Sequence, residues 1–511
     1  MHSLRQQLFR TKPIPADGGE SDTTLKRSLG AFQLTMLGVS SVIGTGIFFV
    51  LSEAVPIAGP AVIWSFVIAA VVAGLCILCY AELASAVPVS GSSYSYTYAA
   101  VGELPAMGVA GCLLLEYAVC SAAVAVGWSQ YVNQLFHDIF GFELPEAISN
   151  APEDGGIINL PSVFLVACCA ALLARGTRES ALVNTIMVMI KVGVLLFFGA
   201  VAVTGWNTDH FADFAPFGFH GVMAGAGTIF FSFVGLDAVA TAGDEAKNPR
   251  RTLPIALLSA LVIITAIYLW VAVTAIGAQP AADFEGQDAG LAVILQNIMG
   301  STWPGTLVAA SAVVSIFSAL MVTIYGQTRI LYTMSKDGMM PKIFSTVNPK
   351  TDTPVANTVI VSAVVALLAA LLPIGFLADL TSLGTLVAFA MVSISVIVLR
   401  RTAPHLKRGF KLPLHPLFPV LSVAGCIWIL KDLKPVTWVV FLVWTAVILG
   451  AWFFTGRKTS VLARTTVMEV VEEAGHSLDP LRPDDMHAGS AEGAASNRAP
   501  EDTTEKTAVL D

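Results

Sequence analysis

Glycine and hydroxyl residues crowd the middle of the first long apolar segment of the chain. The segment reads Gly38-Val-Ser-Ser-Val-Ile-Gly-Thr-Gly-Ile47. Glycine weakens a helix and lets other backbone come close, so we predict that the helix is interrupted at Gly44-Thr45-Gly46. A half-helix beginning there offers free N–H groups and the positive end of its dipole to a carboxylate. For the glycines alone, close packing of helices through small residues is an equally good explanation.

A second segment favours the binding interpretation. Residues 227–241 also carry a mid-depth glycine, Gly235, beside polar side chains. Two interrupted helices at corresponding places in two halves of a chain predict a transport site near the bilayer midplane. The second break is expected to present carbonyls near 231–234 to an ammonium group. Phe231 and Phe233 are either ordinary core residues, or one of them is a gate over the substrate. The two breaks together predict an α-amino acid site formed by Ile43, Gly44, Thr45, Gly46, Ile47, Phe231, Ser232 and Val234.

Two ionisable residues lie deep inside predicted helices, where a charge is costly and is usually functional. Lys191 lies mid-helix in a run of apolar residues. We predict that it takes up and releases a proton during transport; the alternative is a structural plug that satisfies carbonyls of the interrupted first helix. An ammonium group there also argues against sodium coupling. Glu116 is predicted to be a proton partner or a polar wall of the substrate pocket, and the alternative is a helix–helix hydrogen bond.

The elements that must position these residues are membrane helices. The chain has 511 residues, of which 55% are hydrophobic and 13% charged, whereas soluble domains carry about 25% charged residues. Its apolar residues form blocks long enough to cross a hydrocarbon core of about 30 Å as helices. We predict about twelve such blocks: 31–51, 61–86, 105–135, 158–174, 181–204, 221–242, 254–277, 302–332, 354–373, 375–400, 416–432 and 436–455.

Charge placement predicts the orientation of these helices. Lys and Arg gather on the cytoplasmic side of membrane proteins. If the N-terminus is cytoplasmic, all 28 except three (Lys191, Lys431 and Lys434) fall in cytoplasmic segments. We therefore expect both termini in the cytoplasm. Residues 1–30 are predicted to be a disordered arm, and 456–511 a disordered acidic tail without hydrophobic periodicity.

Other chemistries find little support. None of the eight His lies in a predicted helix, and no phosphate-binding P-loop is present. Cys76 and Cys79 form a C-x-x-C inside an apolar helix, where packing is the better explanation. An intramembrane enzyme would need a nucleophile–base pair or a metal site at membrane depth, and the absence of His from the predicted helices argues against it. A channel would be expected to show repeated pore-lining polar residues, and the sequence shows none. We expect no cofactor, metal, nucleotide or nucleic acid; the expected partners are an amino acid, a proton and the lipid bilayer.

Five motifs, in order along the chain, resemble those of the amino acid–polyamine–organocation (APC) superfamily of permeases, in its cationic amino acid transporter-like branch. Besides Gly38 to Ile47, they are Tyr80 to Tyr96 with Val101-Gly-Glu103, Phe230 to Pro249, Arg329 to Pro341, and Arg400 to Phe410.

The resemblance implies an all-α fold of the LeuT type. It has two inverted repeats of five helices, here 31–204 and 221–400, with helices 1 and 6 broken, and two further helices in 416–455. It implies that Lys191 stands at the position of a sodium site, that Glu116 is near the substrate, and that Met321 faces the side-chain pocket. The expected function is proton-coupled uptake of L-amino acids across the cell membrane by alternating access. An exchanger of amino acids or polyamines on the same fold is the alternative.

Overall fold

The structure, a computed structural model, describes residues 8–13, 29–87, 91–175, 181–243, 246–287, 289–349, 351, 353–431, 433–456, 459–461 and 463. Within these residues every regular element is a helix, and the β-bridges Leu29–Ala246 and Asn348–Thr353 are isolated. Backbone groups in hydrocarbon must be satisfied within their own segment, which is why long apolar runs become helices.

Nine α-helices make up most of the first half of the described chain. Their bounds are α2 (Ala31–Val42), α3 (Thr45–Ala58), α4 (Val62–Ala86), α5 (Ser92–Ala100), α6 (Glu103–Phe140), α8 (Leu160–Ala174), α9 (Ala181–Ala202), α10 (Gly218–Phe230) and α11 (Ala238–Thr241). The second half contains α12 (Pro249–Ala278), α13 (Gly290–Met299), α14 (Trp303–Lys336), α15 (Val355–Leu371), α16 (Ile374–Thr402), α17 (Leu417–Leu430) and α18 (Pro435–Ala451).

All twelve predicted blocks are helical in the structure. Eight helical runs among the described residues are long and apolar enough to cross a membrane, and five further apolar helices have 10–17 residues. The prediction of an all-helical, multi-span membrane protein is confirmed. The blocks 158–174, 354–373 and 416–432 correspond to the shorter helices α8, α15 and α17. The short helices α5 and α13 lie outside the predicted blocks, because α5 is rich in Ser and Tyr and α13 is too short to cross.

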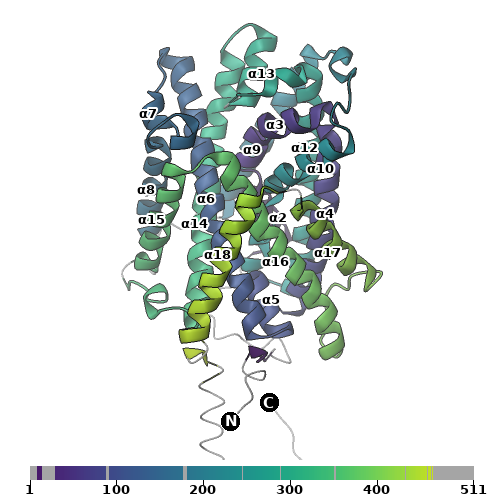
Figure 1. Ribbon diagram of the computed structural model, residues 1–511, viewed down its shortest axis with the longest axis vertical. Coiled ribbons are helices and arrows are strands. Elements are labelled where there is room, and N and C mark those ends of the chain that lie inside the picture. The colour runs from purple at the N-terminus through teal and green to yellow at the C-terminus, as the bar shows by residue number, and fades with distance from the viewer. Residues whose placement is uncertain are drawn as a thin grey trace, which may run out of the picture. The chain divides into compact units, whose positions relative to one another are not determined.

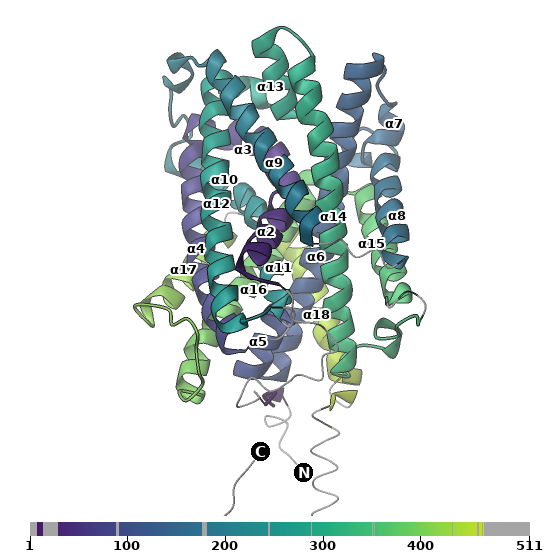
Figure 2. The same ribbon diagram turned by 180° about the vertical axis from the view of Figure 1, so that it is seen from behind.

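Figures 1 and 2 show the helices standing side by side, with α2 in the interior of the bundle. Helices α8 and α15 pack together at one edge and α17 lies at the other. Helices α5 and α13 lie at opposite ends. The central position of α2 matters because the first predicted break follows its last residue.

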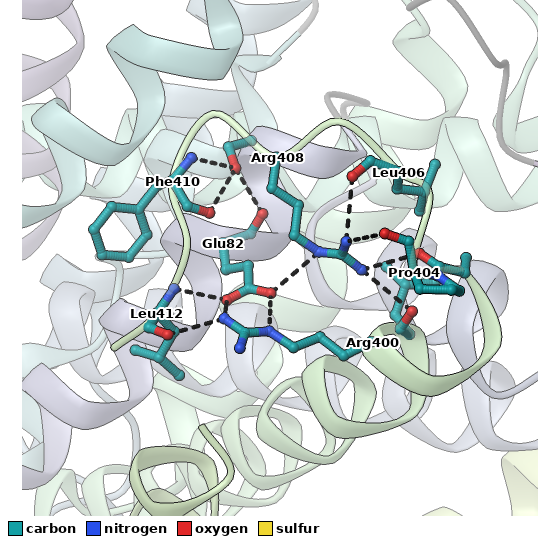
Figure 3. Close-up of polar contacts among 10 residues, drawn as sticks. Glu82, Arg400, Pro404, Leu406, Arg408, Phe410 and Leu412 are labelled. Atoms are coloured by element: carbon teal, nitrogen blue, oxygen red, sulfur yellow. Dashed lines mark hydrogen bonds and ion pairs between the residues drawn. The ribbon is translucent and has the colours of Figure 1, made fainter. Parts of the chain in front are cut away.

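A buried ion-pair cluster joins α4 to the end of α16 and the segment that follows it (Figure 3). Glu82 is 1% exposed, and its Oε1 accepts a 2.7 Å hydrogen bond from Arg400 Nε. Arg408 Nε lies 3.3 Å from the same oxygen, and the Leu412 N–H donates to Oε2 at 2.8 Å. One carboxylate therefore holds two arginines and a backbone amide.

The described N-terminal residues, 8–13, pack on the same end as α5. Arg10 Nε lies 3.7 Å from Glu103 at the start of α6, and Lys12 Nζ lies 2.9 Å from Asp337 after α14. Ser460 also donates to Glu103, at 3.2 Å. Both described ends of the chain thus meet at neighbouring carboxylates. Residues 1–7 and 14–28 of the predicted arm, and the tail from 464, lie outside the described residues.

Candidate functional site

The first helix is interrupted, but slightly earlier than predicted. Helix α2 ends at Val42, Ile43 and Gly44 are non-helical, and α3 begins at Thr45. The prediction that Thr45 and Gly46 belong to the break is wrong, because both have helical backbone. The Gly44 N–H donates to Val42 O at 2.8 Å, so it does not continue the helical ladder to Ser40 O. The first N–H groups of α3 have no partner inside their own helix, as at every helix start.

The second break is confirmed at residues 231–237. Helix α10 ends at Phe230, a 3₁₀ turn covers Phe231–Phe233 (η5), and Val234 is extended before α11 resumes at Ala238. Gly235 has φ +100°, a left-handed conformation that favours glycine. Of the predicted free carbonyls, that of Phe231 accepts the Val234 N–H at 3.1 Å.

The two breaks touch each other. A Cβ atom built on Gly46 would lie 2.8 Å from Ser232 Cα, so only glycine allows this approach. Ser41 Oγ donates to Gly235 O at 2.9 Å, which joins the last turn of α2 to the second break. The interrupted segments, which are far apart in the sequence, therefore form one region with backbone donors at α3 and backbone acceptors at η5.

Lys191 reaches the first helix just before its break. It is 1% exposed, and its Nζ donates to Ser40 O at 3.3 Å. Ser40 O is a carbonyl that the interrupted ladder leaves without its usual partner, the N–H four residues later. A side chain from α9 thus supplies a donor that the helix itself cannot.

Glu116 and Asp237 are both buried, and Asp237 is the last residue of the second break. Glu116, on α6, is 1% exposed, and neither of its carboxylate oxygens has a hydrogen-bond partner among the described residues. Its neighbour Tyr117 donates to Asp237 Oδ2 at 3.1 Å, and Ser92 of α5 donates to the same oxygen at 3.4 Å. Asp237 therefore connects the second break to α5 and α6.

The remaining predicted site residues are buried around the breaks. Ile43, Ile47, Ser232 and Val234 are all buried, and Phe231 packs edge-on against Phe49 with ring centroids 5.5 Å apart. The structure does not describe the Thr45 side chain. A Cβ on Gly44 would lie 2.9 Å from Ala319 Cβ, so α14 passes the first break there. Met321 is buried two residues further along α14.

Sequence reasoning missed Tyr268, on α12. Its hydroxyl donates to Val42 O at 3.1 Å and to Ser232 O at 3.0 Å, one carbonyl from each break. A tyrosine in an apolar helix carries no local sign of such contacts. Within the described residues, no three His, Cys, Asp or Glu side chains gather in a set that could hold a metal ion.

Comparison with known proteins identifies the family. The sequence profile of a family described as amino acid permease matches residues 29–468. The branched-chain amino acid permease BcaP of Bacillus subtilis (strain 168) is 41% identical over 469 residues, covering 90% of this chain and 100% of that protein. The chain is a member of the amino acid permease family.

The permease has further relatives with different names. It is 37% identical over 460 residues to the methylthioribose transporter of Bacillus subtilis (strain 168), covering 89% of this chain and 99% of that protein. Over 406 residues it is 37% identical to human cationic amino acid transporter 4, covering 78% of this chain and 63% of that protein. The predicted family is confirmed, and the permease is a transporter rather than an enzyme.

Proposed function

We propose that the permease is a secondary active transporter that binds the α-carboxylate and α-ammonium groups of an L-amino acid between its two broken helices. The contact between Gly46 and Ser232 carries this proposal, because it brings the donors of α3 beside the acceptors of η5. The carboxylate binds the N–H groups that follow Gly44, and the ammonium binds carbonyls of 231–234. Ile43, Ile47, Phe231 and Glu116 line the rest of the site.

The fold in this proposal is the LeuT type, with 31–204 and 221–400 as inverted repeats and 416–455 as two added helices. The pairing of one break in each repeat supports it. The permease lies in the cell membrane with both termini cytoplasmic. The contact of Lys12 with Asp337 supports that orientation, because it joins two segments that are both predicted to be cytoplasmic.

A competition panel tests the zwitterion site. Purified protein in liposomes is given one radiolabelled amino acid, with unlabelled amino acids, a decarboxylated amine and methylthioribose as competitors. Amino acids should compete, whereas the amine and the sugar should not, because each lacks a group that the two breaks bind. Competition by methylthioribose alone would contradict the proposal.

Proton coupling through Lys191 is the second part of the proposal. Its contact with Ser40 O supports it, because a change of charge on Nζ alters the carbonyl end of α2 directly. In the Lys191→Ala variant we expect an imposed inward pH gradient to stimulate uptake by less than about a tenth of the wild-type stimulation, while counterflow of amino acid persists. The gradient experiment uses liposomes without internal substrate, so wild-type uptake there also excludes the obligate exchanger. Counterflow is measured in separate liposomes that are loaded with amino acid.

The control for Lys191→Ala is Lys431→Ala, which removes a lysine that lies over the Trp428 ring at the end of α17. It should respond to the gradient as the wild type does. If Lys191→Ala responds fully as well, Lys191 has no part in coupling.

We assign the selection of substrates by side-chain size to Met321. Met321 is buried, and in this proposal it closes the side-chain end of the pocket, which suits small neutral amino acids as readily as arginine or lysine. Met321→Ala should extend the pocket. We expect the preference for a large over a small amino acid, measured as a ratio of kcat/KM in uptake assays, to rise roughly tenfold. Met334→Ala, on the same helix but about 20 Å away along its axis, is the control and should leave the ratio unchanged. An equal change in both variants would remove Met321 from the pocket.

A further inference from the structure

The hydroxyl of Tyr268 lies where the two breaks converge. It is within 3.1 Å of Val42 O, the last carbonyl of α2, and 3.0 Å of Ser232 O in η5. Tyr268 is 0% exposed, so no bulk water competes for these carbonyls. Its ring is fixed by edge-on contacts with Phe66 of α4 and Phe233 of η5, at centroid distances of 6.3 and 5.5 Å. Helix α12 thus presents one polar atom to two separate chain segments.

A hydroxyl has one hydrogen, and here it faces two acceptors. Val42 O also accepts a hydrogen bond from the Gly44 N–H at 2.8 Å. Ser232 O, in contrast, depends on Tyr268 for a donor from outside its own turn among the described residues. A buried carbonyl without a donor is unfavourable by about 1–3 kcal/mol. The shared hydrogen therefore favours arrangements in which both breaks stay within reach of the same atom.

We propose that Tyr268 is a positioning residue that sets the spacing between the two breaks, and hence the affinity for the ammonium and carboxylate groups that every amino acid substrate shares. This inference rests on the proposed function. Tyr268 touches the carbonyl ends of both segments and acts on substrate through them. Loss of its hydroxyl should weaken binding of the shared ammonium and carboxylate groups, and so lower the affinity for every amino acid substrate by the same factor, whatever its side chain.

The test uses Tyr268→Phe, which removes only the hydroxyl. We expect the Kd for amino acids in equilibrium binding to detergent-purified protein to rise about tenfold. The rise should be the same for a small, a branched and a large substrate. A residue that only stabilises the fold would lower the yield of folded protein and leave Kd unchanged.

The matched control is Tyr131→Phe. Tyr131 is also fully buried, and its hydroxyl donates at 2.8 Å to Phe48 O, a carbonyl inside α3. Like Tyr268, it donates a hydroxyl hydrogen bond to a carbonyl of the first broken helix. Within the described residues, however, its hydroxyl makes no hydrogen bond to the second break. Its Kd should stay within about twofold of the wild type. Equal losses in both variants, or a Tyr268→Phe protein with wild-type Kd, would overturn the proposal.

A second measurement needs no substrate. Hydrogen–deuterium exchange should accelerate together in peptides covering 42–46 and 231–236 of Tyr268→Phe, and in neither of them in Tyr131→Phe. Acceleration at one break alone would refute the coupling. If the wild type binds no amino acid, the proposed substrate is wrong, and the exchange experiment still decides whether Tyr268 joins the breaks.

Discussion

Gly46→Ala is expected to reduce transport about 100-fold while the protein still folds. The added Cβ would lie 2.8 Å from Ser232 Cα and 2.9 Å from its Oγ, well inside the ordinary carbon contact distance of about 3.5–4.0 Å. The nearest obstacle is backbone, which cannot rotate away as a side chain can. The second break must therefore move relative to α3, and the donors and acceptors of the proposed site move with it.

The measurement is initial uptake rate in liposomes, normalised to the amount of protein that elutes as a single peak in detergent. Gly108→Ala, in α6, is the control, because a Cβ built there meets nothing within 4 Å. This control should transport normally, since alanine stabilises a helix interior by up to about 1 kcal/mol relative to glycine. Retention of half or more of the wild-type rate by Gly46→Ala would show that the contact is not needed for transport.

Glu82→Ala is expected to destabilise the fold by about 3–5 kcal/mol, since it leaves the charges of Arg400 and Arg408 without their shared carboxylate. The variant should give little folded protein, and the remainder should unfold at a clearly lower temperature in detergent. The Leu412 N–H also loses its acceptor, so the segment after α16 should loosen (Figure 3). Tryptophan fluorescence during heating measures the change.

Two variants separate charge from position at this cluster. Glu82→Gln keeps a hydrogen-bond acceptor but loses the charge, so its stability should lie between those of the wild type and Glu82→Ala. Arg401→Ala removes the exposed arginine next to Arg400. Its free energy of unfolding should lie within about 0.5 kcal/mol of the wild-type value. A Glu82→Ala protein as stable as Arg401→Ala would mean that the ion pairs contribute nothing net.

Several local features could be predicted because their causes are local. Runs of apolar residues predict helices wherever hydrocarbon excludes water, and all twelve predicted blocks are helical. The breaks near Gly44 and Gly235 were also predictable, since glycine and polar residues at mid-depth weaken a helix. The boundary of the first break was wrong by two residues. Gly46 is a glycine because Ser232 approaches it, and not because the helix ends there.

The presence of the buried charges was predictable, and the plug interpretation of Lys191 also named carbonyls of the interrupted first helix as its partners, but the individual acceptor was not predictable. A lysine inside an apolar helix predicts a special role, but that Lys191 bonds Ser40 O follows only from the packing of α9 on α2. Tyr268 had no sign in the sequence at all. Its two acceptors come from segments more than 30 residues away along the chain.

By itself the sequence determined that the first long apolar segment is broken at Gly44 and that a second break follows in the sixth, because helix propensity acts over a few neighbouring residues. Only the tertiary structure decided that the two breaks touch at Gly46 and Ser232, and that Ser41 and Tyr268 join them. The physical reason is that hydrogen bonds and close contacts between segments depend on how whole helices pack. No local pattern encodes that packing.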